Sequence, residues 1–265
     1  MKGVGGYLFD LDGTVYRGSR LIPGVDGAIA ELRRRGRRIV FLSNKPLYGR
    51  ADYADKLSDL GIPATEEDVV NSSYVLARAL ARRSPNARVF AVGEAPLVAE
   101  LRRAGLSVTD DPDRIECVVA AFDRTLTWDK LNVAFQALLR GARFYATNPD
   151  RTCPVEEGEV PDAAAVIAAL EATSGRQVEE VFGKPSAHMV EAALERVGLP
   201  AGQCAVVGDR LETDMRMARE NGLLGILTLT GVAREGDLRG AQWTPHHIID
   251  SVASLPQLDE RLRKG

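Results

Sequence analysis

Two aspartates stand two residues apart near the amino terminus, in the stretch YLFDLDGTVYRG. Asp10 and Asp12 follow a short apolar run, and a glycine and a threonine come directly after them. Carboxylates this close repel each other unless a positive charge neutralises them. Their oxygens suit Mg²⁺, and one carboxylate of such a pair can attack phosphorus while the other transfers a proton. The stretch therefore suggests a phosphate-handling metal site, although Asp, Gly and Thr are also typical of a plain turn.

Three further polar clusters follow apolar runs elsewhere in the chain. They are Ser43-Asn44 after RIVFL, Gly183-Lys184-Pro185 after EEVF, and Gly208-Asp209 after CAVV. Taken singly, these clusters could be a helix cap, a surface lysine and a loop. All of them, however, fall where a strand is expected to end, and ligands of open α/β sheets bind outside the carboxyl ends of the strands. Asp209 would then add metal-binding charge, while Lys184 and Ser43 would offer a cation and a hydrogen-bond donor to a phosphoryl group.

The elements that must position these clusters follow from the hydrophobic pattern. Short apolar runs alternate with amphipathic stretches, which predicts strands and helices in alternation and a parallel, doubly wound, Rossmann-like α/β sheet. The expected strands are residues 7–9, 38–42, CAVVGD and GILTLTG. The expected helices are residues 25–35, one through Leu57 and Leu60, one that begins near Thr65, and one that ends near Gly222.

The middle of the chain repeats this alternation with its own set of elements. Strands are expected at RVFAVG, CVVAAFD and RFYATN, and helices at residues 96–104, 128–140 and 162–172. Polar, turn-rich stretches at residues 82–88 and 173–177 mark the seams. We therefore expect an α/β unit at about residues 80–178, inserted into a core made of residues 1–79 and 179–265.

Bulk composition narrows the class of protein. The chain has 265 residues, of which 45% are hydrophobic and 27% charged, a profile typical of a globular protein. Its net charge of -3 gives no reason to expect nucleic-acid binding, and no apolar run is long enough to cross a membrane. The three scattered cysteines and the absence of a signal-peptide pattern favour a cytoplasmic protein without disulfides.

The motifs DLDGT, LSN, GKP and GDRLETD resemble those of the haloacid dehalogenase superfamily of phosphatases, over essentially the whole chain. The large inserted α/β unit is similar to the cap of the superfamily members that carry it between the second and third motifs. Within this group the chain resembles the branch of NagD and p-nitrophenyl phosphatase. The stretches TVYRG, IVFLSN, TLTWDKLNVAFQ, GARFYATNPDR and LTLTG are most similar to a sugar phosphatase of that branch.

The resemblance implies a role for each matching residue. Asp10 would be the nucleophile and Asp12 the general acid and base. Mg²⁺ would be held by Asp10, by the backbone carbonyl of Asp12 and by Asp209. Lys184 would stabilise the charge of the nucleophile and the phosphoryl group. Ser43 and Asn44 would bind phosphate. Asp214 would orient the lysine or a metal-bound water.

The resemblance implies that residues of the cap determine which substrate is accepted. A turn-rich loop, TNPDRTCPVEEG at residues 147–158, follows an expected strand. Asn148, Asp150 and Arg151 are our candidates for contact with the leaving group. Lys45 follows Asn44, where many relatives carry asparagine or a small residue, and we count it among the substrate-binding candidates. Related caps often pair, so we expect a homodimer.

We therefore expect a Mg²⁺-dependent phosphatase of small phosphomonoesters, with sugar phosphates as the favoured class. A large cap would exclude macromolecules from the site. Two alternatives remain open. A phosphotransferase or mutase would use the same aspartyl-phosphate with a different acceptor. A non-catalytic module, similar to a receiver domain, would bind metal and phosphoryl groups without needing Asp12.

Overall fold

The computed structural model describes residues 3–155 and 158–264. Contacts among these residues divide the chain into two compact units. The core unit comprises the described parts of Met1–Ser43, Arg50–Val70 and Lys184–Gly265. The inserted unit comprises Asn44–Gly49 and Asn71–Gly183 over the residues that the structure describes.

The core unit is built on a sheet with the strand order β15-β14-β13-β1-β4-β5. Its strands are β1 (Gly6–Asp10), β4 (Arg38–Ser43), β5 (Val69–Asn71), β13 (Cys204–Gly208), β14 (Leu224–Thr228) and β15 (His247–Ile249). The pairs from β15 to β4 are parallel. The chain builds β4 and β5 on one side of β1 and the later strands on the other, so the strand order reverses between β1 and β13. This arrangement confirms the doubly wound α/β fold.

Helices cover the core sheet, whose central strands β1 and β13 are buried along their whole length. All five residues of β1 are buried, as expected for a parallel strand covered on both faces. Apolar residues of α1 (Val25–Arg34), α2 (Arg50–Asp59) and α9 (Leu255–Lys264) join one core cluster with β1 and β4. The helix α7 (Ala187–Val197) contacts β4, and α8 (Arg216–Glu220) contacts β14. A short hairpin, β2 (Tyr16–Arg17) with β3 (Arg20–Leu21), follows β1.

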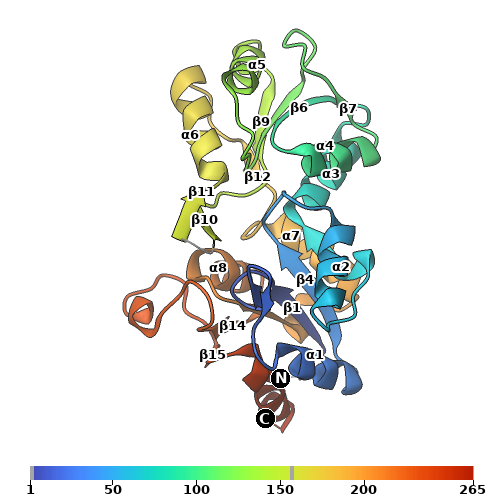
Figure 1. The fold of residues 1–265 in the computed structure, drawn as a ribbon, viewed down its shortest axis with the longest axis vertical. Coiled ribbons are helices and arrows are strands. Elements are labelled where there is room, and N and C mark those ends of the chain that lie inside the picture. Colours follow the sequence, from blue (N-terminus) through green and yellow to red (C-terminus); the bar gives the residue numbers. More distant parts are fainter. Residues whose placement is uncertain (1–2, 156–157, 265) are drawn as a thin grey trace. The chain divides into compact units, whose positions relative to one another are not determined.

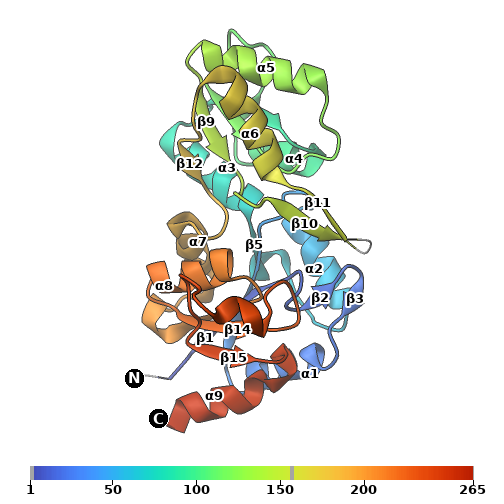
Figure 2. The same cartoon turned by 90° about the vertical axis from the view of Figure 1, so that its left-hand side faces the viewer.

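The inserted unit has a parallel sheet of its own, with the order β12-β9-β8-β6-β7. Its strands are β6 (Arg88–Val92), β7 (Ser107–Val108), β8 (Cys117–Ala120), β9 (Arg143–Ala146) and β12 (Glu180–Val181). Its helices are α3 (Ser72–Arg83), α4 (Ala95–Arg103), α5 (Trp128–Leu139) and α6 (Ala163–Ser174). Figure 1 shows α3 and α4 on one side of this sheet and α5 and α6 on the other. Helices α5 and α6 pack against each other, as Figure 2 also shows.

A second hairpin overlaps the stretch expected to be a loop, residues 147–158, and extends beyond it. It pairs β10 (Thr152–Val155) with β11 (Gly158–Pro161) in antiparallel fashion. Residues 156 and 157 of the expected loop lie outside the described residues. Cys153 and Val160 of the hairpin pack with Phe122 and with Leu47. Because Leu47 takes part in this cluster, the segment Asn44–Gly49 belongs to the inserted unit, although it directly follows a core strand.

The prediction that a helix begins near Thr65 is wrong. Thr65 caps only a single 3-10 turn, Glu66–Asp68, in which the Asp68 side chain accepts a hydrogen bond from the Thr65 backbone N–H at 2.8 Å. Two β-branched valines follow and form β5 instead of a helix. Helix α3 begins only at Ser72, where Asn71 accepts a hydrogen bond from the Tyr74 N–H. The whole of α3 lies in the inserted unit, whereas the expected boundary at residues 79–80 falls inside it.

The apolar run EEVF also differs from its expected position in the core sheet. Glu180 and Val181 form β12, which pairs with β9 at the edge of the inserted sheet. Backbone hydrogen bonds continue beyond β12, because the Phe182 N–H donates to the Ala146 carbonyl and the Gly183 N–H donates to the Thr147 carbonyl. A two-residue strand carries too little pattern to reveal its partner, so the sequence could not assign it to a sheet.

None of the helices in the described ranges combines the length and the apolar character that crossing a membrane requires.

Candidate active site

Asp10 and Asp209 meet because the core sheet reverses its strand order between β1 and β13. These strands are neighbours in parallel register, with Phe9 opposite Val207. Asp10 is the last residue of β1, and Asp209 directly follows β13. Both carboxylates therefore emerge at the carboxyl edge of the sheet, at the switch point where doubly wound folds bind ligands. The side chains are nearly inaccessible, since 8% of Asp10 and 1% of Asp209 is exposed.

Lys184 is buried between two carboxylates of the core unit. Its ammonium group donates to Oδ1 of Asp10 and, at 2.7 Å, to Oδ1 of Asp214. Burial alone would lower the pKa of Lys184, but the charges of Asp10 and Asp214 outweigh burial and raise it. Lys184 is thus held as a cation, with only 3% of its surface exposed.

Asp214 comes from the π-helical turn Leu211–Met215 that leads into α8. Its Oδ2 accepts a hydrogen bond from the Arg210 backbone N–H at 3.1 Å. A Cβ at Gly208, the last residue of β13, would collide with this carboxylate, so glycine is required for space there. Burial raises the pKa of Asp214 to about 6, although the Lys184 charge opposes the shift.

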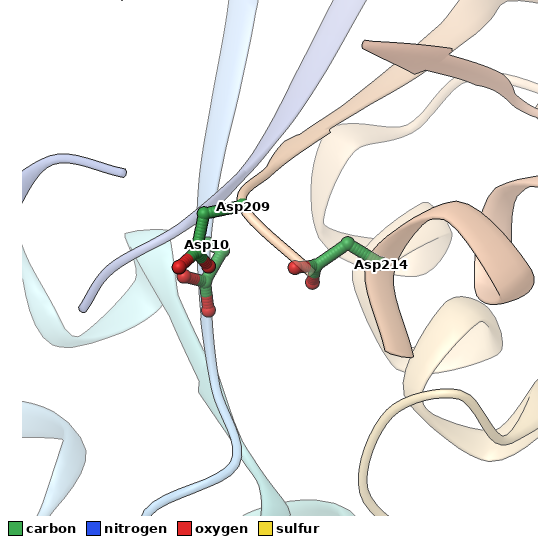
Figure 3. Close-up of side chains that lie close together, drawn as sticks. All are labelled: Asp10, Asp209 and Asp214. Atoms are coloured by element: carbon green, nitrogen blue, oxygen red, sulfur yellow. The ribbon is translucent and has the colours of Figure 1, made fainter. Parts of the chain in front are cut away.

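Three buried carboxylates gather at this edge of the sheet (Figure 3). One oxygen from each of Asp10, Asp209 and Asp214 lies within 4.8 Å of the others. Burial, together with the charges of Asp10 and Asp214, raises the pKa of Asp209 to about 8. A single lysine does not offset this much buried negative charge, so the cluster is suited to an additional cation.

The donor set fits a hard divalent cation. Oδ1 of Asp209 is buried, and no hydrogen bond reaches it from any residue that the structure describes. A buried carboxylate oxygen without a donor is costly unless a ligand satisfies it. All side-chain donors of the cluster are oxygens, which suit Mg²⁺ or Ca²⁺ rather than a soft metal. The cluster can therefore hold such an ion. The two closely spaced aspartates suggest that the Asp12 carboxylate also binds the metal, but its side chain is not among the three members of the cluster. The resemblance implies only the backbone carbonyl of Asp12 as a ligand.

The residues expected to bind phosphate fall in different units. Ser43, the last residue of β4, is buried and its Oγ donates to the Tyr53 hydroxyl at 3.1 Å. Asn44 is the first residue of the inserted unit. Its backbone carbonyl accepts from Ser72 Oγ at 2.7 Å, and its Nδ2 donates to Asp150 Oδ2 at 2.8 Å.

The candidates in the loop of the inserted unit form a hydrogen-bonded network with Asn44. Oδ2 of Asp150 accepts from Nδ2 of both Asn44 and Asn148. Asn148 is fully buried, and its amide also donates to Asp162 Oδ1 at 3.0 Å. Burial raises the pKa of Asp162, while the Asn148 amide and the positive charge of Lys45 oppose the shift. The amide groups of Asn148 are thus used inside the unit, whereas Arg151 is exposed.

Sequence reasoning missed two parts of this arrangement. The sequence predicts Asp162, the residue that caps α6, only as the start of a helix. The segment from Thr230 to Val232 approaches Asp209 at Gly231 and Val232, whereas the sequence predicts Thr230 and Gly231 only as the end of the strand GILTLTG. A Thr-Gly pair two residues after the end of β14 was the available signal, since it occupies the same edge as Asp10 and Asp209.

Comparison with known proteins gives the family. The model of haloacid dehalogenase-like hydrolases matches residues 7–107, and a model described as HAD-hydrolase-like matches residues 181–255. The sugar-phosphatase AraL of Bacillus subtilis is 43% identical over 255 residues, which is 96% of this chain and 93% of AraL.

Solved structures of phosphatases have the same fold. A p-nitrophenyl phosphatase from Archaeoglobus fulgidus superposes with a TM-score of 0.91 at 33% identity, covering 97% of this chain and 99% of that one. A glycerol phosphate phosphatase from Mycobacterium tuberculosis, solved in complex with magnesium, has a TM-score of 0.90 at 34% identity, covering 98% of this chain and 78% of that one. With its motifs and its acidic cluster at the sheet edge, the chain belongs to the haloacid dehalogenase-like hydrolase family, in its NagD-like phosphatase branch.

Proposed function

We propose that this protein hydrolyses small phosphomonoesters, sugar phosphates above all, in a Mg²⁺-dependent reaction that passes through an aspartyl-phosphate on Asp10. The observation that carries this proposal is the buried Asp10 carboxylate at the switch point of the sheet. It is paired with Lys184 and lies beside two further carboxylates. Such a group can act as a nucleophile once the charge of an incoming phosphate is countered.

The residues of the chain divide the reaction between them. An Asp10 oxygen attacks phosphorus, and the bond from phosphorus to the leaving oxygen breaks. Asp12 donates a proton to that oxygen. In the second half, a water attacks phosphorus and gives a proton to Asp12. The bond between Asp10 and phosphorus breaks, so inorganic phosphate is released and the Asp10 carboxylate is restored. Lys184 binds Asp10 and Asp214 and counters the charge of the phosphoryl group.

The proposed Mg²⁺ ligands are the carboxylates of Asp10 and Asp209 and the backbone carbonyl of Asp12, with Asp214 orienting Lys184. When bound, the ion supplies positive charge that neutralises carboxylate and phosphate oxygens at the same place. Support comes from the donor-free Oδ1 of Asp209 and from the magnesium complex of the related glycerol phosphate phosphatase.

We propose that Ser43, Asn44 and Lys45 contact the phosphate end of the substrate. For the leaving group, Arg151 is the best of the three candidates from the loop because its side chain is exposed. Asn148 and Asp150 would act on the substrate through the amide of Asn44, which Asp150 holds at 2.8 Å. The preference for sugar phosphates rests on AraL, which is named a sugar phosphatase.

A panel of phosphomonoesters tests the proposal. Purified protein is incubated with sugar phosphates, phosphoglycolate, nucleotides and p-nitrophenyl phosphate, with MgCl₂ or with EDTA. We expect release of inorganic phosphate only with Mg²⁺, and the highest kcat/KM on sugar phosphates. Transfer of phosphate to a second sugar would instead identify a phosphotransferase or mutase. A protein that binds Mg²⁺ but releases no phosphate from any ester would be a binding module.

Replacing Asp12 by asparagine is expected to stall the reaction at or before the phospho-enzyme. The amide cannot donate a proton to the leaving oxygen or accept one from water, and such proton transfer is worth about 10²–10⁴-fold in rate. Because p-nitrophenolate leaves readily, rapid mixing should show a burst of at most one equivalent per site and then slow turnover. A variant with wild-type steady-state activity would return Asp12 to a structural role in the turn.

Two further expectations belong to the proposal. The three cysteines are free and buried, which is usual in a reducing compartment, and we propose a cytoplasmic enzyme. The expected homodimer stays a prediction, which sedimentation velocity will measure.

A further inference from the structure

The two oxygens of the Asp209 carboxylate have different surroundings. Oδ2 accepts a hydrogen bond from the Val232 backbone N–H at 2.7 Å. The backbone carbonyl of Asp209 accepts a second one from Ala233 N–H at 3.0 Å. Oδ1 is buried and receives no donor from the described residues. The segment after β14 therefore occupies one oxygen of Asp209 and leaves the other available.

Two glycines make this close approach sterically feasible. A Cβ at Gly13 would lie 2.5 Å from Oδ2 of Asp209 and 3.0 Å from the Cα of Gly231. A Cβ at Gly231 would lie even closer to the same oxygen. Gly13 also needs glycine for its positive φ of 89°, but Gly231 has no positive φ. Glycine at position 231 is thus required for space alone.

Thr230 ties this segment to the turn that follows Asp12. Its Oγ1 donates to the backbone carbonyl of Gly13 at 2.7 Å and also bonds Thr228 Oγ1 at 2.9 Å. Arg17 in the β2–β3 hairpin donates its Nε to the Thr230 carbonyl at 2.6 Å. Because Gly13 is the residue after Asp12, Thr230 holds the peptide next to the carbonyl proposed as a metal ligand.

We propose that Thr230, Gly231 and Val232 form a clamp that holds Asp209 with Oδ1 alone directed to the cation, and that this clamp sets the affinity for Mg²⁺. We call it the Asp209 clamp. Its members are positioning residues, since they act through Asp209 and Gly13. The inference rests on the proposed function, because it takes Asp209 and the Asp12 carbonyl to be ligands of the ion.

The preference of Mg²⁺ for strict geometry explains why such a clamp matters. Mg²⁺ demands near-ideal octahedral positions at short distances, so a displaced ligand oxygen weakens binding sharply. Groups that orient a ligand typically contribute 10-fold to 100-fold to metal affinity. Because Oδ2 accepts a hydrogen bond from Val232, Asp209 offers the ion one oxygen instead of two. Coordination through one oxygen suits a six-coordinate ion that retains several waters.

Gly231→Ala tests the steric part of the clamp. The added methyl must displace Oδ2 of Asp209, so we expect Mg²⁺ to bind about 10-fold to 100-fold more weakly. The readouts are calorimetric titration with MgCl₂ alone and the midpoint of the thermal shift against MgCl₂ concentration. Gly202→Ala is the matched control, since no described heavy atom lies within 4 Å of a Cβ there and its φ is not positive.

Thr230→Val tests the clamp without adding bulk. It removes the hydroxyl that holds Gly13 and should weaken Mg²⁺ binding by about 10-fold, near the lower end of the range for orienting groups. Thr230→Ser should restore wild-type affinity because it keeps the hydroxyl. At saturating Mg²⁺ the kcat of Thr230→Val should return to the wild-type value. Thr173→Val is the control, since it removes a comparable hydroxyl bond of 2.7 Å to Ala169 in α6.

The outcomes separate this inference from the proposed function. If Gly231→Ala and Thr230→Val fold and bind Mg²⁺ as tightly as wild type, the clamp is wrong while the phosphatase proposal stands. If the wild-type protein binds no Mg²⁺, both the clamp and the proposed cofactor fail. Should Gly231→Ala not fold, as judged by circular dichroism, Thr230→Val and Thr230→Ser decide the matter alone.

Discussion

Replacing Asp10 by asparagine is expected to abolish Mg²⁺-dependent release of phosphate from p-nitrophenyl phosphate, with turnover falling by about 10⁴-fold or more. A neutral amide is a poor nucleophile, so no covalent bond to phosphorus forms. The fold should be kept, because asparagine has the same shape and its Oδ1 can still accept from Lys184. Activity is measured at saturating substrate, and folding by circular dichroism and thermal melting.

A matched control separates the nucleophile from a general effect of charge. Asp55→Asn removes one carboxylate from the exposed face of α2 and should leave activity unchanged. Incubation with substrate followed by acid quenching should trap covalent phosphate on the wild-type chain but not on Asp10→Asn. A variant with substantial turnover would show that Asp10 is not the nucleophile.

Replacing Lys184 by methionine should impair both chemistry and stability. The variant loses the cation that counters Asp10, Asp214 and the incoming phosphate, and we expect kcat to fall by about 10²–10³-fold, as for loss of one electrostatic donor. Removing one partner of a buried ion pair leaves an uncompensated charge, which costs about 3–5 kcal/mol of unfolding free energy. Phosphatase assays and urea denaturation measure the two effects.

Lys130→Met is the control for the stability effect. Lys130 pairs with the buried side chain of Asp123 at 2.6 Å in the inserted unit, so its loss also strands a buried carboxylate. We expect lower stability but a kcat per folded molecule close to wild type. If Lys184→Met lost only stability, or if both variants lost activity equally, the catalytic role of Lys184 would be disproved.

The strands and the positions of the main motifs could be predicted from the sequence. Apolar runs such as YLFD and CAVVGD form strands because their residues are buried on both sides, and burial depends on the side-chain pattern itself. Parallel strands place their carboxyl ends at the same edge, so Asp10 and Asp209 could be expected at one edge of the sheet, whereas their closeness depends on the strand order. The family resemblance, carried by four short motifs, is confirmed by the comparisons.

Where the local sequence pattern is weak, contacts with distant residues determined the position and extent of an element. The two residues of β12 pair with β9, and Leu47 packs against Phe122. The 3-10 turn at Thr65 stops because Val69 and Val70 find a place in the core sheet. None of these outcomes is encoded within a few neighbouring residues, since each depends on a partner brought in by the fold.

For this protein, the sequence by itself determined the α/β class and the family, and it singled out the residues that we propose to handle phosphate and metal. Only the tertiary structure decided how those residues are held. Asp150 holds Asn44, Lys184 lies between Asp10 and Asp214, and Val232 occupies one oxygen of Asp209. These contacts join segments as much as 174 residues apart. A hydrogen bond or the absence of a Cβ acts over a few ångströms, and only folding brings such groups within that range.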